Sequence, residues 1–143
     1  MRIRPAEAAD FETVTGWLAA ARLPVADLSI EDVSNFLLAE NEGAPVGTIG
    51  LEPFDGIALL RSLVVVPHAQ GGGAGRELVA ALEAEAAKRG INELWLLTTD
   101  ADAYFAALGY AAVPRDDAPD SIRQTTEFAK LCPADAIVMR KTV

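Results

Sequence analysis

The sequence contains little of the chemistry on which several protein classes depend. It has one cysteine, Cys132, and one histidine, His68, among 143 residues. A single cysteine forms no internal disulfide, and with a single histidine it makes no metal-binding cluster. Only 12 basic residues stand against 21 acidic ones, and the net charge of −9 repels nucleic-acid phosphates. We therefore expect no metal site and no nucleic-acid partner.

Long apolar stretches are also missing. The sequence contains no run of 18 apolar residues, which a membrane span would need, and its first residues lack the apolar stretch of a secretory signal. We therefore expect a cytoplasmic protein without a membrane partner. The length and the 51% hydrophobic content suit a single domain over residues 1–143. Homodimer formation stays open, because hydrophobic faces alone do not establish a dimer.

What is present is an alternation of strand and helix patterns. Apolar residues at helical spacing predict helices over Ala6–Arg22, Ala74–Arg89 and Ala101–Leu108, and Asp27 or Ser29 can cap a short helix. Short apolar runs predict strands over Arg2–Arg4, Phe36–Glu40, Val46–Leu51, Ile57–Val66, Glu93–Thr98 and Ala136–Lys141. This order of elements predicts an α/β (α+β) domain built on one mixed sheet.

A glycine-rich loop joins the strand over Ile57–Val66 to the following helix. Its sequence is Gln70-Gly71-Gly72-Gly73-Ala74-Gly75. Glycines let the backbone approach a ligand closely, and the first N–H groups of a helix carry the positive end of its dipole. The loop can therefore bind a pyrophosphate without any basic side chain.

Other nucleotide-binding motifs do not fit this loop. Arg76 stands where the dinucleotide fingerprint needs its third glycine, and Gly75-Arg76-Glu77 replaces the Gly-Lys-Ser/Thr of a Walker loop. The pattern that fits is Gln/Arg-x-x-Gly-x-Gly/Ala, with Gln70, Gly73 and Gly75. The alternative is a glycine-rich connector with no ligand.

Two segments resemble a known family. Ser62–Gly75 resembles the core motif of the GNAT acetyltransferases, and Tyr104–Tyr110 is similar to their second motif, aromatic-aromatic-x-x-Leu-Gly-aromatic. The resemblance implies a mixed, largely antiparallel central sheet flanked by helices, with splayed central strands and acetyl-CoA between them. It implies cofactor contacts from Leu63, Val64, Val65, Gln70, Gly71, Gly72, Gly73, Ala74, Gly75, Arg76, Thr98 and Phe105.

The resemblance also implies direct transfer of the acetyl group to an amine. This reaction needs proton removal from the amine, N–H donors for the oxyanion and a proton donor near the sulfur. A backbone N–H around Val65 would contact the oxyanion, and Tyr104 and Ser62 are the candidate catalytic side chains. Phe105 holds the position where the family commonly has tyrosine, and Tyr104 is rotated from it by about 100° on a helix. The alternatives are a packing role for Tyr104 and a backbone hydrogen bond for Ser62.

The substrate is predicted from the long segment Ala112–Asp135, which is expected to contain a helix of its own. With Leu97–Ala101, its Glu127–Pro133 run resembles the acetyltransferases associated with arsenic resistance and, more loosely, bacterial N-acetylglutamate synthases. Both imply a small amino-acid-like amine.

Arginines offer forked contacts to the carboxylate of such a substrate, and the candidates are Arg61, Arg115 and Arg123. A buried arginine is costly unless paired, so the alternative for Arg61 is an ion pair with Glu52. The alternative for Arg115 and Arg123 is a solvated surface position. A packing role is expected for Cys132.

The predicted function is therefore acetyl-CoA-dependent N-acetylation of a small, amino-acid-like amine, in a resistance or detoxification role. One alternative is a protein N-terminal or lysine acetyltransferase. The other is a sensor that binds acyl-CoA without transferring the acyl group, which the phenylalanine at position 105 keeps open.

Overall fold

The computed structural model describes residues 1–131 and 133–143, so the role expected for Cys132 lies outside the described residues. Within these ranges the strands are β1 (Arg2–Pro5), β2 (Phe36–Asn41), β3 (Ala44–Pro53), β4 (Ile57–Val65), β5 (Glu93–Thr98), β6 (Ala111–Val113) and β7 (Ile137–Thr142). The α-helices are α1 (Phe11–Ala20), α2 (Ala74–Lys88), α3 (Asp102–Ala107) and α4 (Asp120–Arg123). Shorter helical turns are η1 (Ala8–Asp10), η2 (Ile30–Asn35), η3 (Pro67–Ala69), η4 (Arg115–Asp117) and the π-helical η5 (Glu127–Leu131).

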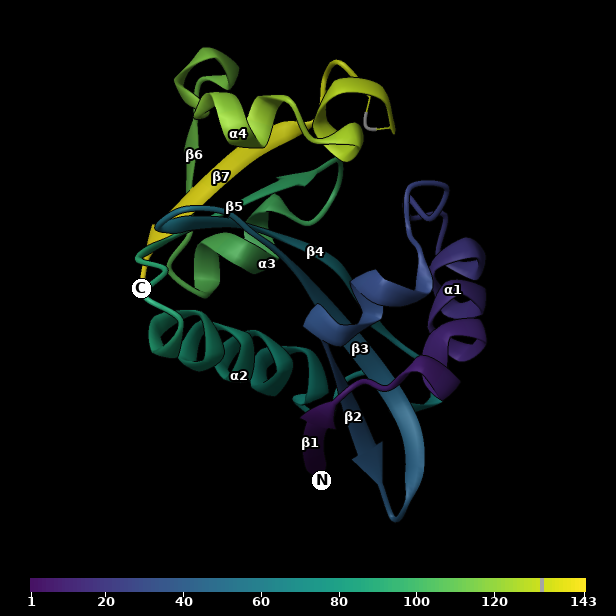
Figure 1. Cartoon of the computed structure of the whole chain (residues 1–143). Helices are drawn as coiled ribbons and strands as arrows, with labels where there is room; N and C mark the ends of the chain where they lie inside the picture. The colour runs from purple at the N-terminus through teal and green to yellow at the C-terminus, as the bar shows by residue number, and fades with distance from the viewer. Residues whose placement is uncertain (132) are drawn as a thin grey trace.

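The seven described strands form one sheet in the order β1-β2-β3-β4-β5-β7-β6. Only the pair β4–β5 is parallel, and the other neighbours are antiparallel. Helix α2 packs on one face against β2, β3 and β4, while α1 contacts β4 on the side of the sheet that η2 also covers (Figure 1). The predicted mixed, largely antiparallel sheet flanked by helices is confirmed.

Strand β4 alternates its side chains between two separate cores, as a strand covered on both faces must. Leu60 belongs to the core beneath α2, together with Leu78 and Leu82. Leu59 belongs to the core on the opposite face, where Ile122 of α4 and Trp95 of β5 are buried. This explains why the sequence of β4 reads as a near-continuous apolar run.

The sheet opens between β4 and β5. Their pairing covers only Ile57–Leu59 with Glu93–Trp95, although β4 continues to Val65 and β5 to Thr98. On its other side β4 carries an irregularity, since the register with β3 shifts between Thr48 and Gly50 and Ser62 has φ +61°. The second halves of β4 and β5 therefore present backbone edges that do not pair with each other.

Several predicted boundaries differ from the structure. The first long helix begins at Phe11 rather than Ala6, because Glu7 and Asp10 form a capping box that encloses η1. It ends at Ala20, before the predicted Arg22, whose φ of +59° is incompatible with an α-helix. The short helix capped by Ser29 is present as η2, a 3-10 helix with Asp32 completing its capping box. Strand β6 (Ala111–Val113) overlaps the start of the segment Ala112–Asp135, which was expected to be a connection with a helix.

Candidate active site

The glycine-rich loop has the geometry of an anion-binding helix start. Gly73 is the N-cap residue of α2 with φ +88°, and Gly71 has φ +87°. A Cβ at either position would meet no atom within 4 Å, so backbone conformation rather than space favours glycine there. Gln70 donates from Nε2 to the backbone oxygen of Val65 at 3.0 Å, which fastens the loop to the end of β4.

A groove of about 430 Å³ runs along this loop. Its lining contains most of the predicted cofactor-binding residues, namely Leu63, Val65, Gln70, Gly71, Gly73, Ala74, Gly75 and Arg76, together with Ala69 and Tyr104. The predicted cofactor contacts Thr98 and Phe105 lie elsewhere, on the wall of a second cavity. The edge of β4 beyond Leu59, which β5 does not cover, continues this groove into the interior.

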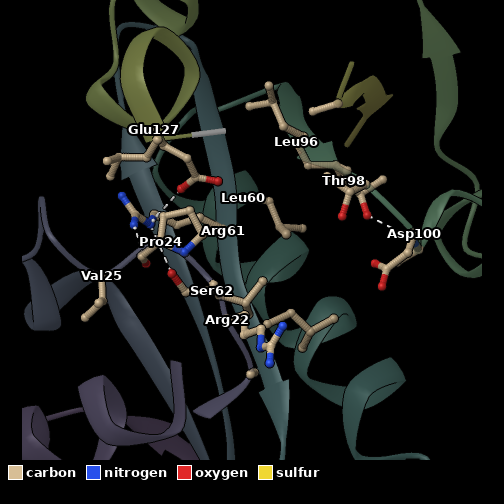
Figure 2. A pocket seen from close by; sticks show the side chains of 18 of the residues that line it. Arg22, Pro24, Val25, Leu60, Arg61, Ser62, Leu96, Thr98, Asp100 and Glu127 are labelled. Carbon is tan, nitrogen blue, oxygen red and sulfur yellow. Dashed lines mark hydrogen bonds and ion pairs between the residues drawn. The ribbon is translucent and has the colours of Figure 1, made fainter. Parts of the chain in front are cut away.

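The second cavity has a volume of about 680 Å³ and lies where β4 and β5 diverge (Figure 2). Its walls come from the loop after α1, the middle of β4, the end of β5, helix α3 and η5. Its polar and charged lining residues are Arg22, Arg61, Ser62, Thr98, Thr99, Asp100, Tyr104 and Glu127. Drug-sized and metabolite-sized ligands occupy cavities of this size.

The groove and the cavity share two lining residues, Leu63 and Tyr104. The Tyr104 hydroxyl lies over Gly75 so closely that a Cβ there would come within 2.5 Å of it. Burial raises the pKa of Tyr104, against the opposing charge of Arg76, so the phenol is protonated at neutral pH. Phe105, only 6% exposed against 41% for Tyr104, packs edge-on between Tyr104 and Tyr110.

Arg61 lies at the centre of a buried ion cluster. Its Nη1 pairs with Asp27 and with Glu52 at 2.6 Å, and its Nε lies 3.1 Å from Glu127. Nη2 donates to Asp27 at 2.9 Å and to the backbone oxygen of Pro24 at 3.2 Å. Burial alone would lower the pKa of Arg61, but the hydrogen bond that it donates to Asp27 and the charge of Glu127 outweigh burial and raise the pKa.

The ion pair between Arg61 and Glu52 that the sequence left as an alternative is therefore present. All five N–H donors of the guanidinium have protein partners, with Nε shared between Glu127 and Ser62. A substrate carboxylate would have to displace one of these acids to reach Arg61.

Ser62 lines the cavity beside this cluster. Its hydroxyl accepts a hydrogen bond from Arg61 Nε at 3.0 Å, so the predicted backbone bond is replaced by a side-chain partner. Thr98 accepts a hydrogen bond from the backbone N–H of Ala101 at 2.9 Å, which fixes the turn from β5 into α3. Asp100 stands in that turn, across the cavity from β4 (Figure 2).

The two remaining predicted arginines lie outside the cavity lining. Arg115 donates to the backbone oxygen of Phe128 at 3.2 Å and stacks over its ring at 4.3 Å. Arg123 pairs with Asp120 at 2.6 Å on the surface of α4. Their predicted contacts with substrate therefore rest on the sequence alone.

Sequence reasoning missed Arg22 and Asp100 and assigned no role to Glu127, although all three line the cavity. Glu127 stands in the run used for the family resemblance, and its acidic side chain among apolar residues was the available signal. Arg22 carried a signal too, as a residue at the end of an apolar helical stripe directly before Leu23-Pro24. Asp100 likewise stands in the Leu97–Ala101 segment used for that resemblance.

The chain matches the family model described as the acetyltransferase (GNAT) family over residues 4–111. It is 33% identical over 95 residues to an amino-acid acetyltransferase of Ralstonia nicotianae, covering 65% of this chain and 21% of the relative. It is 31% identical over 116 residues to an uncharacterized N-acetyltransferase of Chlorobaculum tepidum, covering 80% of this chain and 74% of that relative. The chain thus spans about a fifth of the length of the amino-acid acetyltransferase.

Solved structures share the fold. N-acetylglutamate synthase from Neisseria gonorrhoeae, complexed with coenzyme A and N-acetyl-glutamate, has a TM-score of 0.86 at 23% identity, covering 99% of this chain and 34% of that one. Rv2747 from Mycobacterium tuberculosis, in complex with CoA and NLQ, has a TM-score of 0.84 at 18% identity, covering 100% and 99%. The chain therefore belongs to the GNAT family of acetyltransferases. The predicted acyltransferase class and the acetyl-CoA co-substrate are those of this family.

Two further findings concern the described residues. None of their helices combines the length and apolar character that a membrane crossing needs. No group of three or more histidine, cysteine, aspartate or glutamate side chains within them has a geometry that could hold a metal ion.

Proposed function

We propose that the protein transfers the acetyl group of acetyl-CoA to the amine of a small, amino-acid-like substrate. The observation that carries this proposal is the meeting of the groove and the cavity at Leu63 and Tyr104. The thioester end of a cofactor bound in the groove would therefore lie where the substrate cavity begins. The names of the amino-acid acetyltransferase relatives support the same acceptor class.

The groove suits the two parts of a CoA molecule. Backbone N–H groups between Gly71 and Arg76, at the start of α2, would hold the pyrophosphate. The edge of β4 that β5 leaves uncovered would bind the extended pantetheine through Leu63 and Val65, in the manner of an added strand. Bound there, acetyl-CoA supplies the reactive thioester.

Tyr104 and the carboxylates of the cavity divide the proton transfers between them. As the C–N bond forms and the C–S bond breaks, the amine gives up one proton and the leaving thiolate takes up one. Tyr104, protonated and exposed at the junction, is the proposed donor to the thiolate. The carboxylates that line the cavity are Asp100 and Glu127, and either can accept the amine proton directly or through water.

The shape of the cavity favours a small acceptor over a peptide. Residues 21–26, which follow α1, line one part of the cavity, and Glu127 and Leu131 of η5 line a neighbouring part. Arg61 ties these walls together through Asp27 and Glu127. A polypeptide would need an open groove between them.

A CoA-release assay with acetyl-CoA tests the proposal. The acceptors are the free amino acids, their phosphinic and arsenic-containing analogues, and peptides with free N-termini or lysines. We expect turnover with one or a few free amino acids or analogues, and preference for the analogues would support the resistance role. Turnover on peptides alone, or tight CoA binding with no turnover on any amine, would show the proposal to be wrong.

A further inference from the structure

We propose that Arg22 recognises the carboxylate of the acceptor. This inference rests on the proposed function, because it names the group that selects amino acids among amines. Arg22 follows α1 directly, is exposed, and lines the larger cavity on the side of β4 that holds Ser62 (Figure 2).

Arg22 differs from Arg61, the other cation of the cavity, because it has no carboxylate partner among the described residues. Within the described part of the chain, Arg22 and Arg61 are the arginines and lysines that line this cavity. Arg61 is surrounded by three carboxylates, whereas among the described residues none forms an ion pair or a side-chain hydrogen bond with Arg22. In a chain with a net charge of −9, this leaves one guanidinium in the cavity available for an anionic ligand group.

The backbone at Arg22 is in a conformation that favours glycine. Its φ is +59°, in the left-handed region. The hydrogen bonds from Leu23 N to Leu18 O and from Arg22 N to Ala19 O form the C-terminal motif in which the left-handed residue is usually glycine. A side chain here strains the folded state, and strained residues cluster at ligand sites.

The ion cluster around Arg61 holds the loop after α1 in place and orients the carboxylate of the acceptor. Arg61 holds the segment after Arg22 through the backbone oxygen of Pro24 and the carboxylate of Asp27. Arg61 is therefore a positioning residue for Arg22. Because three acids surround that single guanidinium, the wall around it repels a carboxylate, and the acceptor carboxylate is directed to Arg22.

The test compares an amino acid with its neutral amide in the full-length chain. The wild-type KM is measured for the best amino acid of the acceptor panel and for its α-carboxamide, and then in the Arg22→Gly and Arg22→Lys variants. Glycine suits the left-handed backbone, so Arg22→Gly folds without strain. Lysine keeps the charge but loses the forked geometry.

We expect the wild type to prefer the acid over the amide. In Arg22→Gly the KM for the acid should rise roughly 10- to 100-fold, so the ratio of the KM for the amide to that for the acid falls toward one. Arg22→Lys should give an intermediate ratio. Arg2→Ala is the matched control, since it removes an exposed arginine outside both cavities and should preserve the preference.

The outcomes separate this inference from the proposed function. A wild type that acetylates free amino acids, with an acid-to-amide preference unchanged in Arg22→Gly, overturns the role of Arg22 and leaves the function intact. Equal turnover of acid and amide by the wild type does the same. A wild type that acetylates no free amine overturns both.

Discussion

Neighbouring aromatic residues have different exposure and different contacts around the junction of groove and cavity. Tyr104, Phe105 and Tyr110 pack edge-on as one aromatic group, but only Tyr104 exposes its ring at the meeting point of groove and cavity. The hydroxyl of Tyr110 points elsewhere, to Glu83 at 2.8 Å. The two hydroxyls therefore have separate roles, one proposed in catalysis and one structural.

Removing the hydroxyl of Tyr104 is expected to slow the chemical step. Tyr104→Phe should lower kcat by about 10²-fold, the lower end of what a positioned general acid contributes, while the KM for acetyl-CoA changes little. Steady-state CoA release measures both constants. Tyr110→Phe is the matched control, because it removes a hydroxyl from the same aromatic group outside the cavity. Equal kcat in Tyr104→Phe and the wild type would mean that the thiolate takes its proton from elsewhere.

Tyr110 is expected to make the fold sensitive to alkaline pH. Burial raises the pKa of Tyr110 above the usual tyrosine value of about 10, and the hydrogen bond to Glu83 and the charge of that carboxylate raise it further. The unfolded chain therefore releases this proton near pH 10 while the folded chain retains it, so stability is full below that pH and falls above it. Urea unfolding from pH 8 to 11 should show a shallower loss in Tyr110→Phe. Parallel curves for both proteins would contradict this.

Removing the guanidinium of Arg61 should destabilise the fold. Arg61→Met removes the cation that Asp27, Glu52 and Glu127 share, and breaking such a buried cluster costs about 3–5 kcal/mol of unfolding free energy. Arg140→Met is the control, since its pair with Glu93 at 3.2 Å is about one-third exposed and exposed pairs contribute roughly 0–1 kcal/mol. Urea midpoints compare the two variants. Similar small losses would show that the cluster is not stabilising.

At the scale of elements, the loop before α2 combines two positive-φ glycines with a helix start. Gly73→Ala should destabilise the fold by about 1–2 kcal/mol through its left-handed φ, and raise the KM for acetyl-CoA as the N–H groups turn away. Gly72→Ala is the neighbouring control, because Gly72 lacks a positive φ and a Cβ there would lie 3.7 Å from the nearest atom. Thermal unfolding and acetyl-CoA titration measure the two effects. A larger effect at Gly72 would contradict the assignment.

The elements that the sequence predicts well are those with a strong local pattern. The apolar run of β4, the stripe of α2 and the glycine loop are fixed by burial and by backbone conformation, and each lies within a residue or two of its expected place. Strand β6 was missed because Ala111–Val113 is short and mostly exposed, with no alternation to detect. Its pairing with β7 is a tertiary contact that local sequence does not encode.

The candidate site divides in the same way. The cofactor groove follows from contiguous residues, so the sequence motif predicts it nearly whole. The acceptor cavity draws on the loop after α1, β4, β5 and η5, which lie far apart in sequence. Arg61 illustrates the difference, since its burial was expected but two of its three acids come from 34 and 66 residues away, at Asp27 and Glu127. Arg22 was missed because its place in the cavity depends on packing between segments that lie far apart in the sequence.

At the scale of the whole molecule, the divergence of β4 from β5 unites these parts. Pairing up to Leu59 holds the two halves of the sheet together, and its absence beyond Leu59 leaves room for both ligands. The N-terminal half contributes the loop with Arg22, and the C-terminal half contributes Asp100, Tyr104 and η5. In the proposed function, the acceptor amine and the thioester meet where the two halves of the sheet face each other.

A crystal structure with CoA and the acetylated form of the best acceptor tests this claim most directly. We expect the pyrophosphate on the N–H groups of Gly71–Arg76 and the CoA sulfur within hydrogen-bonding distance of the Tyr104 hydroxyl. We also expect the acceptor carboxylate on Arg22, with the acetylated nitrogen beside Leu63. CoA bound outside the space between β4 and β5, or an acceptor bound outside the 680 Å³ cavity, would contradict it.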